Sequence, residues 1–188
     1  MGGTFDPIHI GHLIAASEVH SVLSLDAVWF IPAGEPWQKS DREVSSAQHR
    51  FAMTKLAVES DERFAVSDIE IRRQGPTRSI DTVRELRAQS PEIELYWIVG
   101  ADVATRITSW FEWEQFVKEV TLVVVNRSES DVVVELPFTY VSIEMPAVRI
   151  SATQLRERYK QGKSSKYLVP AQVDEYIKSF NIYGKQDG

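Results

Sequence analysis

"GGTFDPIHIGHL", residues 2–13, opens the chain with a glycine pair, an Asp-Pro turn and two histidines. A glycine pair lets the backbone turn sharply and come close to a ligand. A helical pattern from Leu13 to Leu23 follows, and the first turn of a helix attracts anions through its unpaired amides. His9 and His12 are three residues apart, so both face the same way at a helix start. The alternative is a helix cap with two incidental histidines, but the whole string favours a phosphate-binding turn.

Outside this stretch, short apolar runs alternate with amphipathic segments. The runs are rich in β-branched and aromatic residues and end near Gly, Pro or Asn, which is typical of strands. The predicted strands are 27–33, 63–71, 94–101, 121–127 and 138–143. The predicted helices are 13–23, 45–59, 79–89, 113–118, 151–161 and 170–180. Several strands are apolar on both faces, so the alternation predicts an α/β fold with a doubly wound parallel sheet.

The start of the chain is unusual for such a fold. A glycine turn of this kind should follow the first, central strand directly, yet only Met1 precedes Gly2. We therefore expect the first strand to be missing, with roughly five to eight apolar residues upstream, a strand's typical length. The alternative is a natural truncation that leaves a gap in the middle of the sheet.

Composition narrows the class of protein. The 188 residues fit one domain, 1–188, and the absence of cysteine excludes disulfides and thiol chemistry. A formal net charge of −6 argues against nucleic-acid binding through a broad basic face. No apolar run approaches the roughly 18 residues that span a bilayer, and the first residues do not resemble a signal peptide. We therefore expect a cytoplasmic protein with no membrane or nucleic-acid partner.

Polar and aromatic residues follow the predicted strands, where open α/β sheets bind ligands. Lys39 lies in the loop after strand 27–33, within reach of a polyphosphate, although an exposed lysine is usually only solvated. Gly100 and Asp102 follow strand 94–101, where Asp102 can accept a ribose hydroxyl. Trp110 and Phe111 offer ring faces for stacking, unless they belong to the core.

A second cluster lies near the end of the chain, in "VRISATQLRERY" at 148–159. Ser151 and Gln154 fit a helix capping box. The alternative is a phosphate cradle made of the hydroxyls of Ser151 and Thr153, the helix amides and Arg156. Arg127, at the end of strand 121–127, would add a second guanidinium at this sheet edge.

With these motifs in view, the chain resembles the nucleotidyltransferase superfamily, whose signatures HxGH and ISxTxxR match "HIGH" at 9–12 and "ISATQLR" at 150–156. Over essentially all 188 residues it resembles the bacterial nicotinate-nucleotide adenylyltransferases. The segments specific to that family are "PWQK" at 36–39, "GPTRSIDT" at 75–82, "GAD" at 100–102 and "SWFEW" at 109–113. The resemblance implies a Rossmann-like fold.

The resemblance also implies a role for each matching residue. His9 and His12 would stabilise the transition state at the α-phosphate of ATP, and Ser79, Trp110 and Phe111 would bind the nicotinate ring and carboxylate. The residues implied in ATP binding are Gly3, Thr4, Phe5, Lys39, Gly100, Asp102, Arg127, Ser151, Thr153 and Arg156. Two departures from the family pattern are Arg78, where many members have Tyr, and Ser128-Glu129 after Arg127, where Pro-Gly is frequent.

The implied reaction is adenylyl transfer from ATP to nicotinate mononucleotide, which gives deamido-NAD and pyrophosphate in NAD biosynthesis. Mg²⁺ would arrive with ATP, without a dedicated protein metal site, and the family favours a homodimer. Two other functions stay open: another adenylyltransferase of the superfamily, or a non-catalytic nucleotide sensor on the same scaffold. A dinucleotide-binding dehydrogenase is excluded, because G-x-G-x-x-G is absent near the start.

Overall fold

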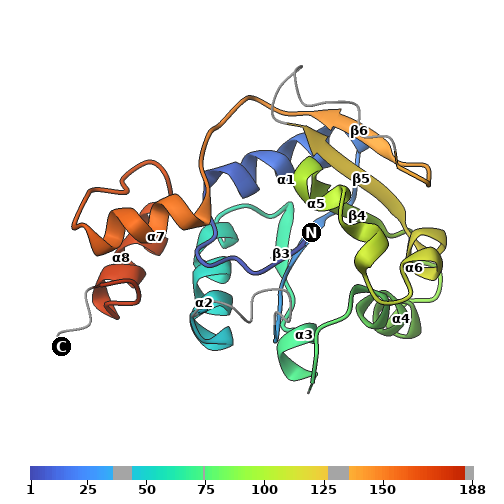
Figure 1. Cartoon of the computed structure of the whole chain (residues 1–188), viewed down its shortest axis with the longest axis horizontal. Helices are drawn as coiled ribbons and strands as arrows, with labels where there is room; N and C mark the ends of the chain where they lie inside the picture. Colours follow the sequence, from blue (N-terminus) through green and yellow to red (C-terminus); the bar gives the residue numbers. More distant parts are fainter. Residues whose placement is uncertain (36–43, 74, 127–135, 185–188) are drawn as a thin grey trace.

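The computed structural model describes residues 1–35, 44–73, 75–126 and 136–184 (Figure 1). The strands are β1 (Gly2–Gly3), β2 (Val28–Pro32), β3 (Phe64–Val66), β4 (Tyr96–Gly100), β5 (Thr121–Asn126) and β6 (Val141–Glu144). The helices are α1 (Ile10–Leu23), α2 (Ala47–Val58), α3 (Ile69–Arg72), α4 (Ser79–Gln89), α5 (Ala101–Ala104), the 3₁₀ helix η2 (Ile107–Ser109), α6 (Trp113–Glu119), α7 (Ala152–Lys160) and α8 (Ala171–Ser179).

The described strands form two parallel three-stranded sheets, β1-β2-β3 and β4-β5-β6. β1 also contacts β4, and a Cβ on Gly2 would lie 3.1 Å from the ring of Trp97 on β4. The two sheets therefore adjoin at β1, which gives the spatial order β3-β2-β1-β4-β5-β6. This is the order of a doubly wound nucleotide-binding sheet, so the predicted fold class is confirmed.

The first strand is short, and the expectation that it is missing is corrected in part. Gly2 pairs with Ile31, and Gly3 pairs with Pro32. The main-chain N–H of Ile31 donates to the carbonyl of Met1 at 2.9 Å, and that of Ala33 donates to the carbonyl of Gly3 at 2.9 Å. Residues 1–3 thus lie between the two sheets, where β1 pairs with β2 and contacts β4.

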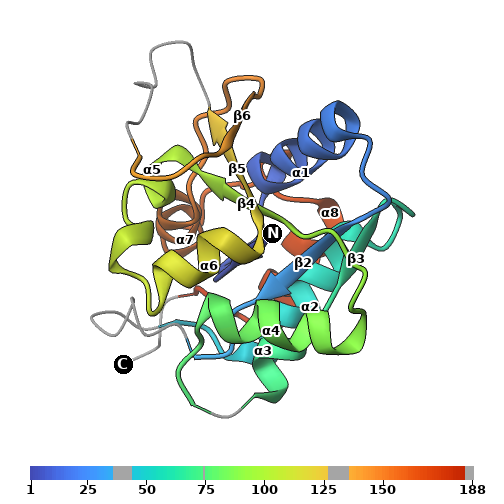
Figure 2. The ribbon, with the colours of Figure 1, turned by 90° about the vertical axis from the view of Figure 1, so that its right-hand side faces the viewer.

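The alternation of side chains along β5 shows how the helices cover both faces. Val123 and Val125 belong to a core cluster with side chains of α1, α2, α7 and α8. Leu122 and Val124 belong to a second cluster with side chains of α4 and α6. Successive residues of a strand point to opposite faces, so a run that is apolar throughout is buried on both. Figure 1 shows α7 and α8 at one end of the molecule and α4 and α6 at the other, with α2 between them, and Figure 2 shows α4 and α6 in front of the strands.

One predicted strand is wrong in its second half. The strand predicted at 63–71 ends at Val66, and α3 follows from Ile69. The hydroxyl of Ser67 accepts a hydrogen bond from the main-chain N–H of Ile69 at 3.3 Å, which turns the chain into the helix. Arg72 then pairs with Asp68 at 3.1 Å, one helical turn apart. The predicted strand includes "IEI" at 69–71, but the turn at Ser67 and Asp68 ends β3 before it.

The described helices are all too short or too polar to cross a membrane. The other predicted helices and strands are found within a few residues of their expected bounds. The short elements α5 and η2 after β4 were not predicted, because segments of three or four residues show no periodicity.

Candidate active site

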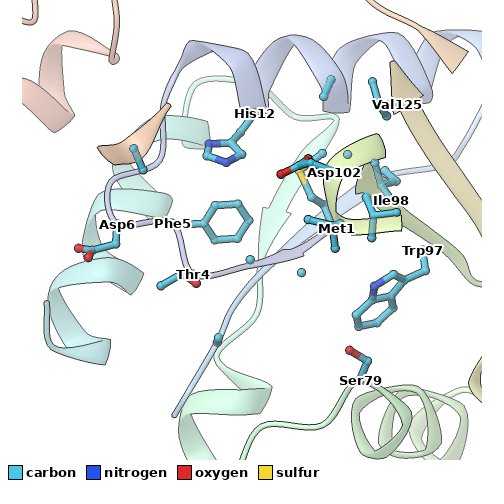
Figure 3. Close-up of a pocket in the computed structure, with 18 of the residues that line it drawn as sticks. Met1, Thr4, Phe5, Asp6, His12, Ser79, Trp97, Ile98, Asp102 and Val125 are labelled. Atoms are coloured by element: carbon cyan, nitrogen blue, oxygen red, sulfur yellow. The ribbon is translucent and has the colours of Figure 1, made fainter. Parts of the chain in front are cut away.

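A cavity of about 550 Å³ lies at the carboxyl ends of the parallel strands. The loop after β1 and the end of β4 form two of its walls, and the first residues of α1, α4 and α7 also line it. Figure 3 shows Phe5 and His12 on one side of this space, and Trp97 and Ser79 on another. Three helix N-termini therefore converge on one cavity, and each presents main-chain amides that attract anions.

The two histidines are stacked at the start of α1. Their ring centroids are 3.8 Å apart, and the edge of Phe5 packs against His12 at 5.2 Å. The main-chain N–H of His9 donates to Nδ1 of His12 at 3.2 Å. An Nδ1 that accepts cannot carry the proton, so the fitting tautomer of His12 has its proton on Nε2. The side chain is thus held as a hydrogen-bond donor in the cavity wall.

Gly11 separates the histidines for a steric reason. A Cβ at this position would lie 3.1 Å from Nδ1 and 3.2 Å from Cε1 of the His9 ring. His9 itself is only 3 % exposed, so its ring has little room to move. The glycine between the two histidines therefore permits the stack.

The N-terminus of α7 forms the second anion-binding wall. Ser151 caps the helix, because its hydroxyl accepts from the N–H of Gln154 at 3.2 Å. Thr153 lies in the first turn and receives a hydrogen bond of 3.1 Å from Nη2 of Arg156. The other arm of Arg156 donates to the main-chain carbonyl of Asp6 at 2.6 Å. Arg156 thus joins the α7 wall to the loop that carries His9.

Arg50 supports the loop from behind. Its guanidinium is fully buried and donates to the main-chain carbonyls of Thr4 at 3.0 Å, Gly34 at 2.9 Å and Ser45 at 2.9 Å. Burial lowers the pKa of Arg50, and the nearby Asp6 carboxylate opposes that shift. A guanidinium is suited to hold several carbonyls at once, because its donors form a rigid planar fork. Arg50 therefore fixes the glycine turn relative to residues 34 and 45.

The N-terminus of α4 forms the wall opposite the histidines. Ser79 is the first residue of α4, Arg78 is its N-cap, and both line the cavity. The guanidinium carbon of Arg78 lies 3.9 Å from the centroid of the Phe111 ring, and 46 % of Phe111 is exposed. Trp110 also lines the cavity, and its ring packs against Phe116 at 5.4 Å. This wall therefore combines aromatic surface with a cation and a helix N-terminus.

A buried carboxyl group lies beside this wall. Glu70 is 4 % exposed and lines the cavity, and its Oε1 accepts a hydrogen bond of 2.7 Å from the hydroxyl of Thr82. Burial raises the pKa of Glu70 to about 7, although Thr82 and Arg73 favour the ionised form. Glu70 is thus partly neutral near pH 7.

The end of β4 provides the remaining predicted contacts. A Cβ on Gly100 would lie 2.8 Å from Oδ1 of Asp102, so only glycine lets this carboxylate fold back over the strand end. Asp102 is exposed and lines the cavity. Arg106 lines it as well, and its Nε donates to the main-chain carbonyl of Asp102 at 3.2 Å.

The structure brings most of the predicted site residues together. Arg156 is bonded to the cavity wall rather than being part of it. Lys39 and Arg127 lie outside the described residues. The twelve that line the cavity are Gly3, Thr4, Phe5, His9, His12, Ser79, Gly100, Asp102, Trp110, Phe111, Ser151 and Thr153.

Several positions that line or support the cavity were not among the predicted site residues. Glu70 follows β3 and could have been found by the rule that ligands bind beyond strand ends, had the strand been ended at Val66. No motif in the sequence indicates a role for Arg50, because it lies within an ordinary helical pattern. Gly11 is part of HxGH, and its role becomes clear only from the packing of His9.

Comparison with known proteins agrees with this geometry. The family model for cytidylyltransferase-like proteins matches residues 1–158. The chain is 46 % identical to a Nocardioides protein named as a probable nicotinate-nucleotide adenylyltransferase, over 97 % of this chain and 92 % of that one. It is 44 % identical to a protein of the same name from Acidothermus cellulolyticus, over 100 % and 94 %.

Solved structures show the same fold. The nicotinic acid mononucleotide adenylyltransferase of Plasmodium falciparum, complexed with NaAD, superposes with a TM-score of 0.80 at 20 % identity, over 97 % of this chain and 94 % of that one. Because the identity is low, this likeness supports the fold, and the closer sequence relatives support the family. The chain therefore belongs to the cytidylyltransferase-like family and, within it, to the nicotinate-nucleotide adenylyltransferases.

Proposed function

We propose that this protein transfers the adenylyl group of ATP to nicotinate mononucleotide, and releases nicotinate adenine dinucleotide and pyrophosphate. One observation carries the proposal: a single cavity joins the stacked His9 and His12, with the α7 N-terminus, to the aromatic and cationic wall at α4. The first set suits a triphosphate, and the second suits a pyridine ring with a carboxylate. An enzyme that joins two nucleotides needs both ends in one space.

The reaction is a displacement at phosphorus that needs no nucleophile from the enzyme. An oxygen of the 5′-phosphate of nicotinate mononucleotide attacks the α-phosphorus of ATP, and the bond from that phosphorus to the bridging oxygen of pyrophosphate breaks. The attacking phosphate is already an anion at pH 7, so no strong general base is required. The protein has to align two phosphates that repel each other and stabilise the charge that develops on the transferred group.

His9, His12 and the helix amides would supply that stabilisation. The Nε2–H of His12 would donate to an oxygen of the α-phosphate, and Arg156 and the α7 amides would bind the leaving pyrophosphate. Lys39 and Arg127 are proposed from the sequence to contact the same phosphates. The backbone of Gly3, Thr4 and Phe5 would contact the nucleotide. Gly100 and Asp102 would bind the adenosine.

The test is pyrophosphate release from ATP with nicotinate mononucleotide, by the wild type and by His12→Ala. We expect kcat to fall by at least about 100-fold in the variant, as for other groups that act in the transition state, while the Kd for ATP changes much less. Near-normal turnover would contradict the role given to His12. Binding of ATP without release by the wild type would instead favour a nucleotide sensor.

Substrate choice is tested by comparing acceptors. Ser79, Trp110 and Phe111 would bind the nicotinate ring and its carboxylate, so turnover should be faster with nicotinate mononucleotide than with nicotinamide mononucleotide. A preference for the amide would overturn the substrate assignment. Turnover only with a pantetheine or flavin phosphate would place the protein in another branch of the superfamily.

The metal, oligomeric state and location belong to the same proposal. No group of three or more His, Asp and Glu side chains suited to a metal ion occurs within the described ranges. Mg²⁺ would then be bound mainly by the ATP phosphates and by water, and EDTA should stop pyrophosphate release until Mg²⁺ is added. We also propose a homodimer, which light scattering would test, and a cytoplasmic location, where both substrates are available.

A further inference from the structure

We propose that Arg78 makes this enzyme select the pyridine carboxylate over the corresponding amide, by binding the carboxylate directly. The inference rests on the proposed function, because it assigns a role to a residue in the nicotinate end of the cavity. It concerns a side chain that the family resemblance does not assign, since many members have tyrosine at this position.

The position of Arg78 is defined by its neighbours. The residue is the N-cap of α4 with extended backbone dihedrals, φ −125° and ψ 129°, and it lines the cavity next to Thr77 and Ser79. Its guanidinium carbon lies 3.9 Å from the centroid of the Phe111 ring. A guanidinium packed against an aromatic ring keeps its N–H donors for a further partner. Arg78 is therefore held in the cavity wall by the ring, with donors left for a ligand.

Neighbouring arginines contrast with Arg78 in their partners. Arg73 is paired with Glu85 at 2.6 Å, and Arg84 is paired with Glu112 at 2.5 Å. Arg78 forms no ion pair with a carboxylate of the described chain, and its contact in this region is the Phe111 ring. Among the described residues, the cation in the cavity wall therefore has no salt bridge of its own, in contrast to Arg73 and Arg84.

The N-terminus of α4 also favours an anionic ligand, and the acidic residue in its first turn, Asp81, lies 3.9 Å from Arg84. α4 has eleven residues, and its N-terminus presents main-chain amides beside Ser79. Glu70, a buried carboxyl that also lines the cavity, accepts from Thr82, and burial keeps part of its population neutral near pH 7. Asp102 lines the cavity from the end of β4, a different wall. A carboxylate would gain a charge-assisted bidentate contact from Arg78, whereas a carboxamide is neutral and brings its own donors.

The experiment measures kcat/KM for nicotinate mononucleotide and for nicotinamide mononucleotide, each at saturating ATP. In Arg78→Gln, we expect the acid-to-amide ratio of kcat/KM to fall by about 10-fold or more, mainly through a higher KM for the acid. Arg78→Lys keeps the charge without the planar fork and should retain an intermediate ratio. The KM for ATP should stay within about twofold in both variants, because the ATP phosphates bind at the opposite wall.

The matched control is Arg84→Gln, which removes one positive charge from the same helix at an exposed position outside the cavity wall. Its ratio should equal that of the wild type. An unchanged ratio in Arg78→Gln would overturn the inference, whether both kcat/KM values fall together or neither falls. If Arg78→Gln does not fold, Arg78→Lys decides the question. An acid-to-amide ratio in Arg78→Lys equal to that of the wild type would show that a charge alone is enough, which contradicts a planar, bidentate contact. Failure of the wild type to adenylylate either mononucleotide would overturn the proposed function itself, before any variant is compared.

Discussion

Tyr183 donates a hydrogen bond of 2.7 Å to Oδ1 of Asp6, a residue 177 positions earlier in the chain. Both side chains are buried, at 6 % and 1 % exposure. Asp6 precedes His9 in the loop that lines the cavity, and its main-chain carbonyl also accepts a bond from Arg156. Tyr183, near the end of the described chain, thus holds the loop that carries the proposed catalytic histidines. Tyr183 lies beyond residues 1–158, the part matched by the family model.

Tyr183→Phe tests this link. Removing the hydroxyl leaves a buried carboxylate with one donor fewer, which should lower the free energy of unfolding by about 1–3 kcal/mol. We expect a lower urea midpoint and a modest loss of kcat as the loop loses its anchor. Tyr167→Phe is the control, because Tyr167 is 79 % exposed. An unchanged midpoint for Tyr183→Phe would show that the hydrogen bond contributes nothing.

Arg50→Lys tests the support behind the glycine turn. A lysine ammonium cannot reach three carbonyls in the geometry of the guanidinium fork, so at least two charge-assisted hydrogen bonds should be lost. We expect the free energy of unfolding to fall by about 3 kcal/mol or more, measured by denaturant titration. Arg63→Lys, at an exposed ion pair with Asp61, should leave the midpoint nearly unchanged. Equal midpoints for the two variants would contradict the role of Arg50.

Local patterns in the sequence predicted most of the fold, because buried strands and amphipathic helices differ in period. The strand predicted at 121–127 is β5, Thr121–Asn126, and the helix predicted at 79–89 is α4, Ser79–Gln89. What the patterns could not give is how chain segments far apart in sequence meet. The contacts of Arg50 with Thr4, or of Tyr183 with Asp6, join such segments, and nothing in either local sequence indicates them.

The residues of the candidate site also divide into those that local motifs indicate and those that only tertiary contacts place. His9, His12, Ser151 and Thr153 belong to motifs whose residue types suit phosphate, so the sequence alone marked them. Arg78 was noticed only as a departure from a family pattern, and its place in the cavity wall depends on the ring of Phe111 from a later segment. Side chains that act through tertiary contacts are therefore the ones that sequence reasoning missed.

Glu70→Gln tests the buried carboxyl group through the pH dependence of stability. The pKa of Glu70 rises from its ordinary 4.5 to about 7 in the folded protein. Between these values the folded state binds more protons than the unfolded state, so this residue makes stability fall as pH rises from about 4.5 to 7. The difference corresponds to roughly 3 kcal/mol. Glutamine stays neutral, so the free energy of unfolding of Glu70→Gln should equal that of the wild type near pH 4.5 and exceed it at pH 8.

The measurement is the urea midpoint of both proteins at several pH values. The amino group of Met1 is also buried, which lowers its pKa to about 5, so its own contribution rises with pH and opposes that of Glu70. The charge of Glu70 raises the pKa of this amine, so the difference between the two proteins reports on Glu70 together with its interaction with the amine. Glu62→Gln, at an exposed position, is the control. A difference that does not grow with pH would contradict the raised pKa.

Gly11→Ala separates the geometry of the two histidines from the stability of the helix that carries them. Gly11 lies in the first turn of α1, so the roughly 1 kcal/mol by which alanine is favoured over glycine in a helix interior is an upper limit, and crowding of the buried His9 ring opposes it; thermal stability should therefore change little. The new Cβ, however, would lie 3.1 Å from Nδ1 of His9, and the ring would have to shift by a few tenths of an ångström. Because His9 stacks on His12, both rings would move from their places at the cavity. We expect kcat to fall by about 10-fold or more, since small misplacements of catalytic groups are costly. Ser21→Ala, exposed on the same helix, should leave kcat unchanged. Full turnover in Gly11→Ala would mean that the histidine stack tolerates displacement, and that its close packing does not serve the reaction.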